Sequence, residues 1–352
     1  MAALGTHSSR NHQPSGPTGG LVAFSAPYRF FPGQGSMGLM ATYLVTGGAG
    51  FIGSHICEAL RARGDGVRVL DDLSSGRLEN LGGPAAGVEF VRGSLTDPAA
   101  CRAAVAGVAG IFHEAAQVSV PRSIEDPHAS YQVNVQGTLN LLEAARAAKV
   151  ERLVFAASSA AYGDSETLPK VESMLPQPLS PYASGKLAGE QLLRVYASCY
   201  GMRTVSLRYF NVFGPRQADD SPYTGVIALF VRALLRGQAP VIYGDGLQSR
   251  DFTYVSNVVE ANLSAMARDL DEPGAVINVG GGERITLREL YDALSSELGV
   301  RIEVRHAPAR AGDVRDSLAS VEKARALLGY APRVGWREGL RRTVEWYRQR
   351  VS

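Results

Sequence analysis

The sequence predicts an α/β protein built on a doubly wound parallel sheet. Short apolar segments of strand length alternate with longer helical segments over most of residues 41–210. Such alternation is typical of parallel strands joined by crossover helices. A glycine-rich turn follows the first apolar segment, where sheets of this class bind phosphates. With 352 residues, 45% of them hydrophobic, the chain is long enough for one large or two smaller domains.

Strands are expected where apolar residues gather in short runs, at residues 43–45, 67–70, 88–91, 110–113, 152–156 and 204–207. Helices are expected between them, at residues 51–63, 97–106, 127–149 and 182–200. The rest of the chain adds predicted helices at 226–236, 287–298, 321–328 and 336–348 and a strand at 302–304. Because parallel sheets bind ligands beyond the carboxyl ends of their strands, the residues that follow each strand are the candidates for a site.

Charge and cysteine content exclude several kinds of partner. Lys and Arg number 36 against 34 Asp and Glu, without a basic run, so we expect neither a nucleic-acid nor a membrane partner. Cys57, Cys101 and Cys199 lack metal-ligand spacing, so we expect no metal and reduced core thiols in a cytoplasmic protein. Residues 1–40 are rich in Gly, Ser and Pro, which predicts a disordered leader.

The segment after the first strand has the features of a dinucleotide site. Gly47, Gly50 and Gly53 permit a tight turn, close approach of a pyrophosphate to backbone N–H groups, and close packing of a helix on the sheet. The second strand ends at Asp71, about twenty residues later, where a carboxylate would accept hydrogen bonds from the adenosine ribose. Asp71 would repel a 2′-phosphate, which favours NAD, although the nearby Arg77 leaves NADP open.

Small residues follow the fourth strand. Ala115 and Ala116 would let a dinucleotide lie along the backbone, so both are predicted to bind the cofactor. His113 ends that strand and has no partner at metal-ligand spacing. We therefore expect a buried, hydrogen-bonded histidine rather than a metal ligand or an acid–base group.

A tyrosine and a lysine four residues apart form a candidate acid–base pair. A Ser-Pro helix start precedes them and places Tyr182 and Lys186 on one helix face. A nearby ammonium favours the phenolate, so Tyr182 could act as a base near neutral pH. Ser158 or Ser159, at the end of the fifth strand, could hydrogen-bond the substrate oxygen. The alternatives are an ordinary surface Tyr and Lys, and turn serines that bond the backbone.

Further motifs occur with these: Ser158-Ser159-Ala160-Ala161-Tyr162-Gly163, Arg208-Tyr209-Phe210-Asn211-Val212-Phe213-Gly214-Pro215, Arg250-Asp251-Phe252 and Gly312-Asp313. Together with the glycine turn and the Tyr/Lys pair, they give a resemblance from about residue 41 to the C-terminus. The chain resembles the extended short-chain dehydrogenase/reductase superfamily, and within it the NAD-dependent nucleotide-sugar epimerases of the UDP-glucose and UDP-N-acetylglucosamine 4-epimerase type.

This resemblance implies a Rossmann domain for NAD over residues 41–210, to which part of the later chain returns, and a smaller α/β substrate domain over mainly residues 211–352. It implies a cofactor site of Gly47, Gly50, Phe51, Ile52, Gly53, Asp71, Leu95, Ala115, Ala116, Asn134, Tyr182 and Lys186. It implies catalysis by Ser158, Tyr182 and Lys186. It implies that the UDP-sugar is bound by Ser158, Ser159, Asn211, Arg250, Arg310, Asp313 and Ser317.

Asn211 and Arg250 would contact the diphosphate, for which an arginine fork is well suited. The chain departs from the family at Ser94, where relatives commonly carry an Asp that bonds the adenine. It departs again at Val118, where some relatives place a lysine near the cofactor. The resemblance also implies a homodimer through helices around residues 135–148 and 182–200, and Gly185 and Gly189 would permit close helix contact there.

The implied reaction is C4 epimerisation through a transient 4-keto sugar, with Tyr182 as base. Dehydratases of this superfamily usually place an Asp-Glu pair after the hydroxyl residue, and UDP-glucuronate decarboxylases typically carry a Glu there; this chain has Ser159, Ala160 and Ala161. The missing acid favours epimerisation. Those two activities, a UDP-glucuronate epimerase and a catalytically silent NAD-binding protein are the alternatives.

Ser317 aligns with a position that is a bulky Tyr in glucose-only relatives and small in those that accept N-acetyl sugars. A serine there would leave room for an acetamido group. We therefore expect UDP-GlcNAc and UDP-GalNAc to be accepted alongside or above UDP-Glc and UDP-Gal, unless Ser317 is an ordinary loop residue.

Overall fold

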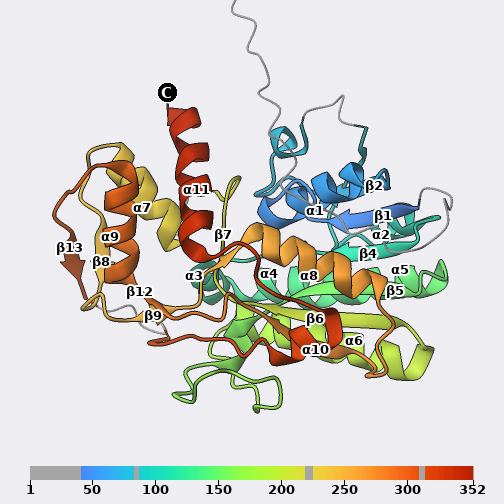
Figure 1. Ribbon diagram of the computed structural model, residues 1–352. Coiled ribbons are helices and arrows are strands. Elements are labelled where there is room, and N and C mark those ends of the chain that lie inside the picture. The colour runs from blue at the N-terminus through green and yellow to red at the C-terminus, as the bar shows by residue number, and fades with distance from the viewer. Residues whose placement is uncertain (1–40, 83–86, 219–224, 309–313, 352) are drawn as a thin grey trace, which may run out of the picture.

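The computed structural model describes residues 41–82, 87–218, 225–308 and 314–351 (Figure 1). The predicted disordered leader, residues 1–40, lies outside this described part. No helix among the described residues is both long and apolar enough to cross a membrane.

Among the described residues, seven parallel strands form the central sheet in the order β11-β6-β5-β4-β1-β2-β3. The six strands that the sequence predicts are β1 (Thr42–Thr46), β2 (Gly66–Asp71), β3 (Glu89–Arg92), β4 (Gly110–His113), β5 (Arg152–Ser158) and β6 (Arg203–Tyr209). The seventh, β11 (Ala275–Val279), was missed and pairs with β6. The strand order reverses between β1 and β4, which confirms the doubly wound sheet.

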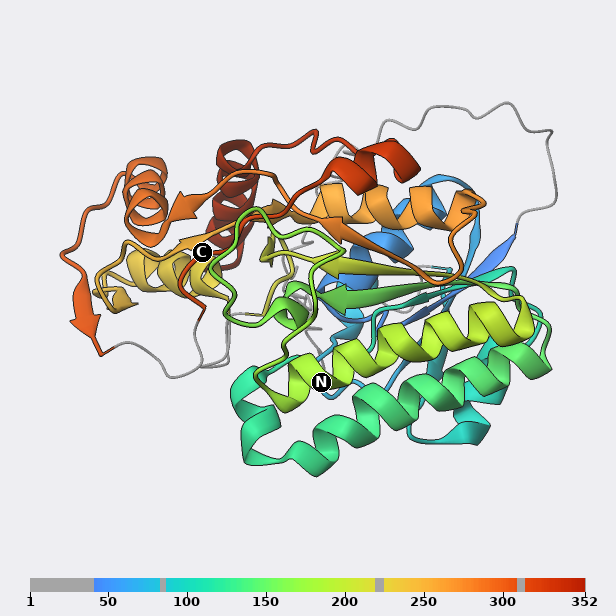
Figure 2. The same ribbon diagram turned by 90° about the horizontal axis from the view of Figure 1, so that it is seen from below.

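Helices cover both faces of this sheet (Figure 2). One face carries α2 (Pro98–Val105), α5 (Gly137–Ala147) and α6 (Pro181–Tyr200). The other carries α1 (Phe51–Ala62), α8 (Val255–Ala267) and α10 (Glu322–Leu328). Side chains of β5 alternate between two cores, with Phe155 packed toward α6 and Val154 toward α8. The sheet is therefore buried on both faces, which explains its continuous apolar strands.

The predicted helix at 127–149 is divided into α4 (Pro127–Tyr131), a π-helical turn at Gln132–Gln136, and α5. The short α3 (Val120–Glu125) precedes it and was not predicted. Cys57 and Cys101 are buried as expected, but the expectation of a core thiol is wrong for Cys199, which is exposed. Cys199 lies on the last turn of α6, on the side that faces solvent.

A second core holds the remaining helices, α7 (Val226–Leu235), α9 (Leu287–Leu298) and α11 (Trp336–Val351), at the left of Figure 1. Three strand pairs border it: β7 (Val212–Phe213) with β10 (Thr253–Tyr254), β8 (Val241–Tyr243) with β13 (Arg305–Ala307), and β9 (Ser249–Arg250) with β12 (Ile285–Thr286).

The strand predicted at residues 302–304 is wrong in position, because the paired residues are Arg305–Ala307. The Tyr291 hydroxyl donates to the carbonyl of Ile302 and accepts its N–H at 3.2 Å. Those backbone groups are therefore not available to a neighbouring strand, and the Ile302 side chain packs against the second core.

The two glycines of α6 contact this chain's own interior. A Cβ on Gly189 would lie 2.5 Å from the Phe155 ring, and a Cβ on Gly185 would lie 3.1 Å from Asn134 Cβ. Both glycines allow α6 to pack closely within the subunit. The expectation that they permit close contact with a second subunit is therefore wrong.

Replacement of Gly189 by leucine should destabilise the fold. Gly189→Leu places a branched side chain against Phe155, and we expect the free energy of unfolding in urea to fall by about 1–3 kcal/mol. Gln191→Leu, at an exposed position of the same helix, is the matched control and should change it by less than about 0.5 kcal/mol. Equal stability of the two variants would contradict the packing described for α6.

Candidate active site

A cavity of about 1490 Å³ lies along the carboxyl ends of the strands and extends to residues around the second core. Such an edge is where doubly wound sheets bind ligands. It brings together sixteen of the site residues that the sequence predicts: Gly47, Gly50, Phe51, Ile52, Gly53, Asp71, Leu95, Ala115, Ala116, Ser158, Ser159, Tyr182, Lys186, Asn211, Arg250 and Ser317. Of the other three, Asn134 does not line it, and Arg310 and Asp313 lie outside the described residues.

The glycine turn fits a dinucleotide pyrophosphate. Gly47 has φ +67°, and a Cβ there would lie 2.7 Å from the backbone N of Ala115. A Cβ on Gly53 would lie 2.3 Å from the carbonyl oxygen of Gly47. Helix α1 begins after Gly50 without a side-chain cap, so its first N–H groups point toward the cavity edge. A phosphate at this position would be stabilised by those N–H groups and the helix dipole.

Asp71 joins the end of β2 to the glycine turn. Its carboxylate accepts hydrogen bonds from the N–H groups of Ala49, at 3.0 Å, and Leu73, at 2.8 Å. Burial raises the pKa of this carboxyl, and the two N–H donors oppose that shift. Asp71 thus fixes the turn and lies on the cavity wall, where the sequence places the adenosine ribose.

His113 is buried and hydrogen-bonded, as the sequence predicts. Its Nδ1 lies 2.8 Å from Thr46 Oγ1 and its Nε2 lies 3.0 Å from Thr138 Oγ1. Burial, with a smaller effect of the Lys186 charge, lowers the pKa of the imidazole to about 3. His113 is therefore neutral and connects β1 to α5 through its two ring nitrogens.

Asn134 holds the loop after β4 instead of lining the cavity. Its Oδ1 accepts the N–H of Gln117 at 2.9 Å, and its Nδ2 donates to the Gln117 carbonyl at 3.0 Å. Both polar atoms of the Asn134 side chain, which the sequence predicts to bind the cofactor, are thus bonded to the backbone of Gln117. These bonds fix the chain just beyond Ala115 and Ala116, which line the cavity.

Ser158, Tyr182 and Lys186 meet at the end of β5. Ser158 Oγ accepts the N–H of Ala160 at 3.2 Å and also hydrogen-bonds the Tyr182 side chain. Lys186 Nζ is buried and donates to the Ala156 carbonyl at 2.8 Å. The predicted helix start is present, because Ser180 Oγ accepts the N–H of Ala183 at 3.2 Å. Three residues from two elements thus line one wall.

Burial dominates the ionisation of this group. It raises the pKa of Tyr182, and the hydrogen bond from Ser158 offsets that shift in part. Burial lowers the pKa of Lys186 to about 8, against the attraction of Glu114. Desolvation of the phenolate is thus the larger effect on Tyr182 here, and the expectation that Lys186 and the nicotinamide charge favour the phenolate stays a prediction for the NAD-bound site.

The candidate substrate residues line the cavity where β6 and β9 end. Asn211 Nδ2 donates to the Asp251 carbonyl at 3.3 Å, and Arg250 Nη1 donates to the carbonyls of Ser249 and Arg315 at 2.9 and 3.0 Å. Ser317 is buried and donates its N–H to the Ser249 carbonyl at 3.2 Å. The backbone around Ser249 thus holds both Arg250 and Ser317 in this part of the cavity.

Sequence reasoning missed two carboxylates, Asp251, which supports the loops beside the cavity, and Glu114, which lines it. Asp251 accepts the N–H groups of Gly281, Gly282 and Ala319 at 2.6, 3.1 and 3.0 Å, and burial raises its pKa to about 6. Its place directly after Arg250 in the sequence was the available signal. Glu114 lines the cavity beside two candidate cofactor residues, and no motif indicated a role for it.

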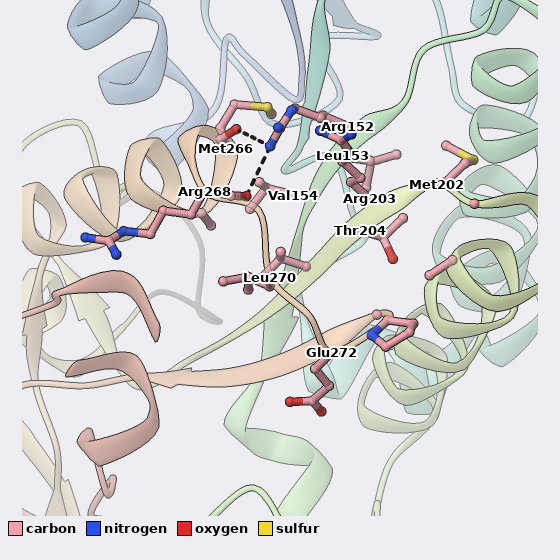
Figure 3. Close-up of a pocket in the computed structure, with 16 residues that line it drawn as sticks. Arg152, Leu153, Val154, Met202, Arg203, Thr204, Met266, Arg268, Leu270 and Glu272 are labelled. Atoms are coloured by element: carbon pink, nitrogen blue, oxygen red, sulfur yellow. Dashed lines mark hydrogen bonds between the residues drawn. The ribbon is translucent and has the colours of Figure 1, made fainter. Parts of the chain in front are cut away.

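A second cavity, of about 190 Å³, lies at the amino ends of β5 and β6 (Figure 3). Arg152 Nη1 donates there to the carbonyls of Met266, at 3.2 Å, and Arg268, at 3.1 Å, and Nη2 pairs with Asp269. The guanidinium thus ties β5 to the end of α8. None of the predicted site residues that the structure describes lines this cavity. Within the described ranges, no cluster of His, Cys, Asp or Glu could hold a metal ion.

The sheet, the glycine turn at its switch point and the Ser/Tyr/Lys wall define a dinucleotide-dependent enzyme of the Rossmann class. The family model described as the NAD dependent epimerase/dehydratase family matches residues 43–280. The chain belongs to this family, and its cofactor is NAD.

Similar proteins support the same assignment. The chain is 42% identical over 316 residues to the UDP-glucose 4-epimerase of Mycolicibacterium smegmatis, and the match covers 87% of this chain and 98% of that protein. The UDP-glucose 4-epimerase of Thermus thermophilus, solved with NAD, is 44% identical, with a TM-score of 0.81 over 87% of this chain and 99% of that one. The UDP-N-acetylglucosamine 4-epimerase of Methanobrevibacter ruminantium M1, solved with UDP-N-acetylmuramic acid, is 39% identical, with a TM-score of 0.84 over 88% and 99%. The chain is thus a member of a family of UDP-sugar epimerases.

Buried neutral histidine makes the fold sensitive to acid. His113 has its folded pKa lowered from 6.5 to about 3, so its contribution to stability is present above pH 6.5 and is lost as the pH falls toward 3. Between about pH 7.5 and about pH 5, this loss should be about 2 kcal/mol in the free energy of unfolding. His113→Gln should remove that share of the pH dependence, measured by urea unfolding at both pH values.

His128→Gln, at an exposed histidine, is the control and should keep the wild-type slope. His55, whose pKa burial also lowers to about 3, keeps a similar contribution in both variants. An identical pH slope in His113→Gln and the wild type would contradict a neutral His113.

Proposed function

We propose that this protein catalyses the NAD-dependent C4 epimerisation of a UDP-sugar through a transient 4-keto sugar. The observation that carries the proposal is one cavity lined by the glycine turn after β1, by Ser158, Tyr182 and Lys186 at the end of β5, and by Asn211 after β6 together with Arg250, where β5 lies between β1 and β6 in the sheet. This order places an acid–base group between a site that fits a dinucleotide and cationic and amide groups that fit a diphosphate.

NAD, when bound, supplies the group that takes the C4 hydride of the sugar and returns it to the opposite face. Tyr182 Oη takes the proton of the 4-hydroxyl and gives it back to the product. Ser158, which hydrogen-bonds Tyr182, orients that oxygen. Lys186, protonated and bonded to the Ala156 carbonyl, offsets the negative charge that develops on the phenol.

Arg250 and Asn211 would bind the diphosphate while the sugar turns. Arg250 is held by the carbonyls of Ser249 and Arg315, which fixes the direction of its guanidinium. The 4-keto sugar can rotate about its phosphate linkage only if there is free space beside Tyr182. The nucleotide must stay bound during this rotation. A cavity of about 1490 Å³, large enough for both ligands, is consistent with this requirement.

The residues after Ser158 disfavour elimination and decarboxylation. A dehydratase or a UDP-glucuronate decarboxylase of this superfamily would place a carboxylate at Ser159, Ala160 or Ala161, and this chain has none there. No acid in this segment can protonate a departing group at C6. Besides NAD, which would take and return the C4 hydride, epimerisation needs no side-chain carboxylate in this segment, only the hydroxyls of Ser158 and Tyr182 and the ammonium of Lys186.

The proposed substrates are UDP-GlcNAc and UDP-GalNAc alongside or above UDP-Glc and UDP-Gal. Ser317 lines the cavity with a small side chain that leaves space for an acetamido group. A homodimer in the cytoplasm also belongs to this proposal, by likeness to the family.

The proposal is tested by an NMR time course with UDP-glucose, UDP-GlcNAc and UDP-glucuronate, each offered without added NAD. A C4 epimer is the expected product, because the cofactor is regenerated in each turnover. Release of carbon dioxide, a 4-keto-6-deoxy product or no turnover would contradict the proposal.

Removal of the phenol hydroxyl should abolish the proton transfer. Tyr182→Phe should lower kcat by about 10²–10⁴-fold, the usual contribution of a positioned acid–base group. Tyr131→Phe, at an exposed tyrosine on α4, is the matched control and should retain wild-type kcat. Near-normal turnover by Tyr182→Phe would exclude Tyr182 as the base.

A bulky residue at position 317 should restrict the substrates. Ser317→Tyr should lower kcat/KM for UDP-GlcNAc by about 10- to 100-fold and leave that for UDP-glucose within about threefold. Ser317→Ala keeps the space and should preserve both activities. Acetamido-sugar turnover that is unaffected by Ser317→Tyr would disprove the role of this position.

A further inference from the structure

Glu114 is a carboxylate on the cavity wall to which neither the motifs nor the mechanism assigns a role. Its Oε1 accepts a hydrogen bond from the Tyr209 hydroxyl at 3.0 Å. The Tyr209 oxygen in turn accepts from Asn262 Nδ2 at 2.7 Å, and Asn262 is fully buried on α8. The carboxylate is therefore held in place by a chain of side chains that reaches the helix behind the sheet.

The strand register brings Glu114 and Lys186 to the same end of the sheet without a direct ion pair between them. His113 of β4 is paired with Phe155 of β5, so Glu114 comes level with Ala156. The carbonyl of Ala156 is the acceptor of Lys186 Nζ. Because Ala156 has only a methyl group, the Glu114 side chain can extend over β5 to Tyr209 on β6. The carboxylate and the ammonium thus lie at the same strand end.

The Glu114 carboxylate and the Lys186 ammonium both lose favourable hydration through burial when they are charged. Each charge also stabilises the other. Burial raises the pKa of Glu114, and the Tyr209 hydrogen bond and the Lys186 charge oppose that shift. Burial lowers the pKa of Lys186, and Glu114 opposes that shift. Attraction between opposite charges in a buried site is much stronger than in water.

The other groups around Lys186 are neutral near pH 7. His113 on β4 has its pKa lowered to about 3, and burial raises the pKa of both Tyr182 on α6 and Tyr209 on β6. Among the described residues, Glu114 is the carboxylate whose charge favours the Lys186 ammonium, and burial raises its own pKa to about 7.

We propose that Glu114 is a positioning residue for the reaction: its carboxylate keeps the Lys186 ammonium protonated, so that Lys186 stays charged where the Ala156 carbonyl holds it. This inference rests on the proposed function for its catalytic consequence, but the charge of Lys186 can be measured without substrate. Lys186 that lost its proton could not offset charge on Tyr182, so Glu114 would extend the active pH range upward.

Glu114→Gln removes the charge and keeps an oxygen that can accept from Tyr209. Lys186 should then lose its proton at a pH lower by about 1 unit or more. The alkaline limb of the kcat profile should move down by the same amount, while KM for the UDP-sugar stays within about threefold.

The direct measurement is an NMR titration of the NAD-bound protein with ¹³C-labelled lysine. The sequence has four lysines, Lys149, Lys170, Lys186 and Lys323, so the spectrum is simple, and Lys186→Arg assigns the signal of interest. Glu166→Gln, which removes an exposed carboxylate, is the matched control and should leave the Lys186 titration unchanged.

Tyr209→Phe provides a second test that keeps the carboxylate. Loss of the hydrogen bond raises the pKa of Glu114, so the Lys186 titration should move in the same direction by a smaller amount. A Lys186 titration that is unchanged in both variants would overturn the inference. If the wild type turns over no UDP-sugar, the proposed function fails, and the titration still decides whether Glu114 controls Lys186.

Discussion

The close approach of Gly47 to Ala115 is the constraint on which the cavity depends. These residues follow β1 and β4, the neighbouring strands between which the order of the sheet reverses. A Cβ on Gly47 would lie 2.7 Å from the Ala115 backbone N, so any other residue would force the two loops apart. The loops after β1 and β4 therefore lie in contact, and both line the cavity.

Asp251 fixes the loops beside the second core, as the close packing at Gly47 fixes the loops after β1 and β4. One buried carboxylate accepts N–H groups from the loop after β11 and from Ala319, two residues beyond Ser317. The carbonyl of the same residue accepts from Asn211, and its neighbour is Arg250. The side chain and the main chain of Asp251 therefore connect the segments that carry Asn211, Arg250 and Ser317 to the loop after β11. That coupling explains how a small second core can hold a substrate in register with Tyr182.

Local sequence patterns predicted the elements whose signals are local. Six strands and the Ser180 cap depend on apolar runs and capping chemistry, which a short window contains. β11 was missed because it is a single run of five residues whose partner, β6, lies about seventy residues earlier. Ile302 was misplaced because the Tyr291 hydroxyl takes its backbone groups. Asn134 and Glu114 show the same limit in the site, since the roles of these side chains depend on contacts that the motifs do not encode.

Burial favours the neutral form of every ionisable group in the Ser158, Tyr182 and Lys186 part of the site. It raises the pKa of Tyr182 and Glu114 and lowers that of Lys186, so each group by itself favours its neutral form. Epimerisation requires a phenolate, and that form must be supported by positive charge close by. Lys186 provides one such charge if Glu114 keeps it protonated, and the nicotinamide ring of NAD provides another when bound. The phenolate form of Tyr182 would therefore be favoured only when NAD occupies the cavity. Without NAD, Tyr182 would stay neutral, and the protein would avoid the cost of a buried, unpaired phenolate.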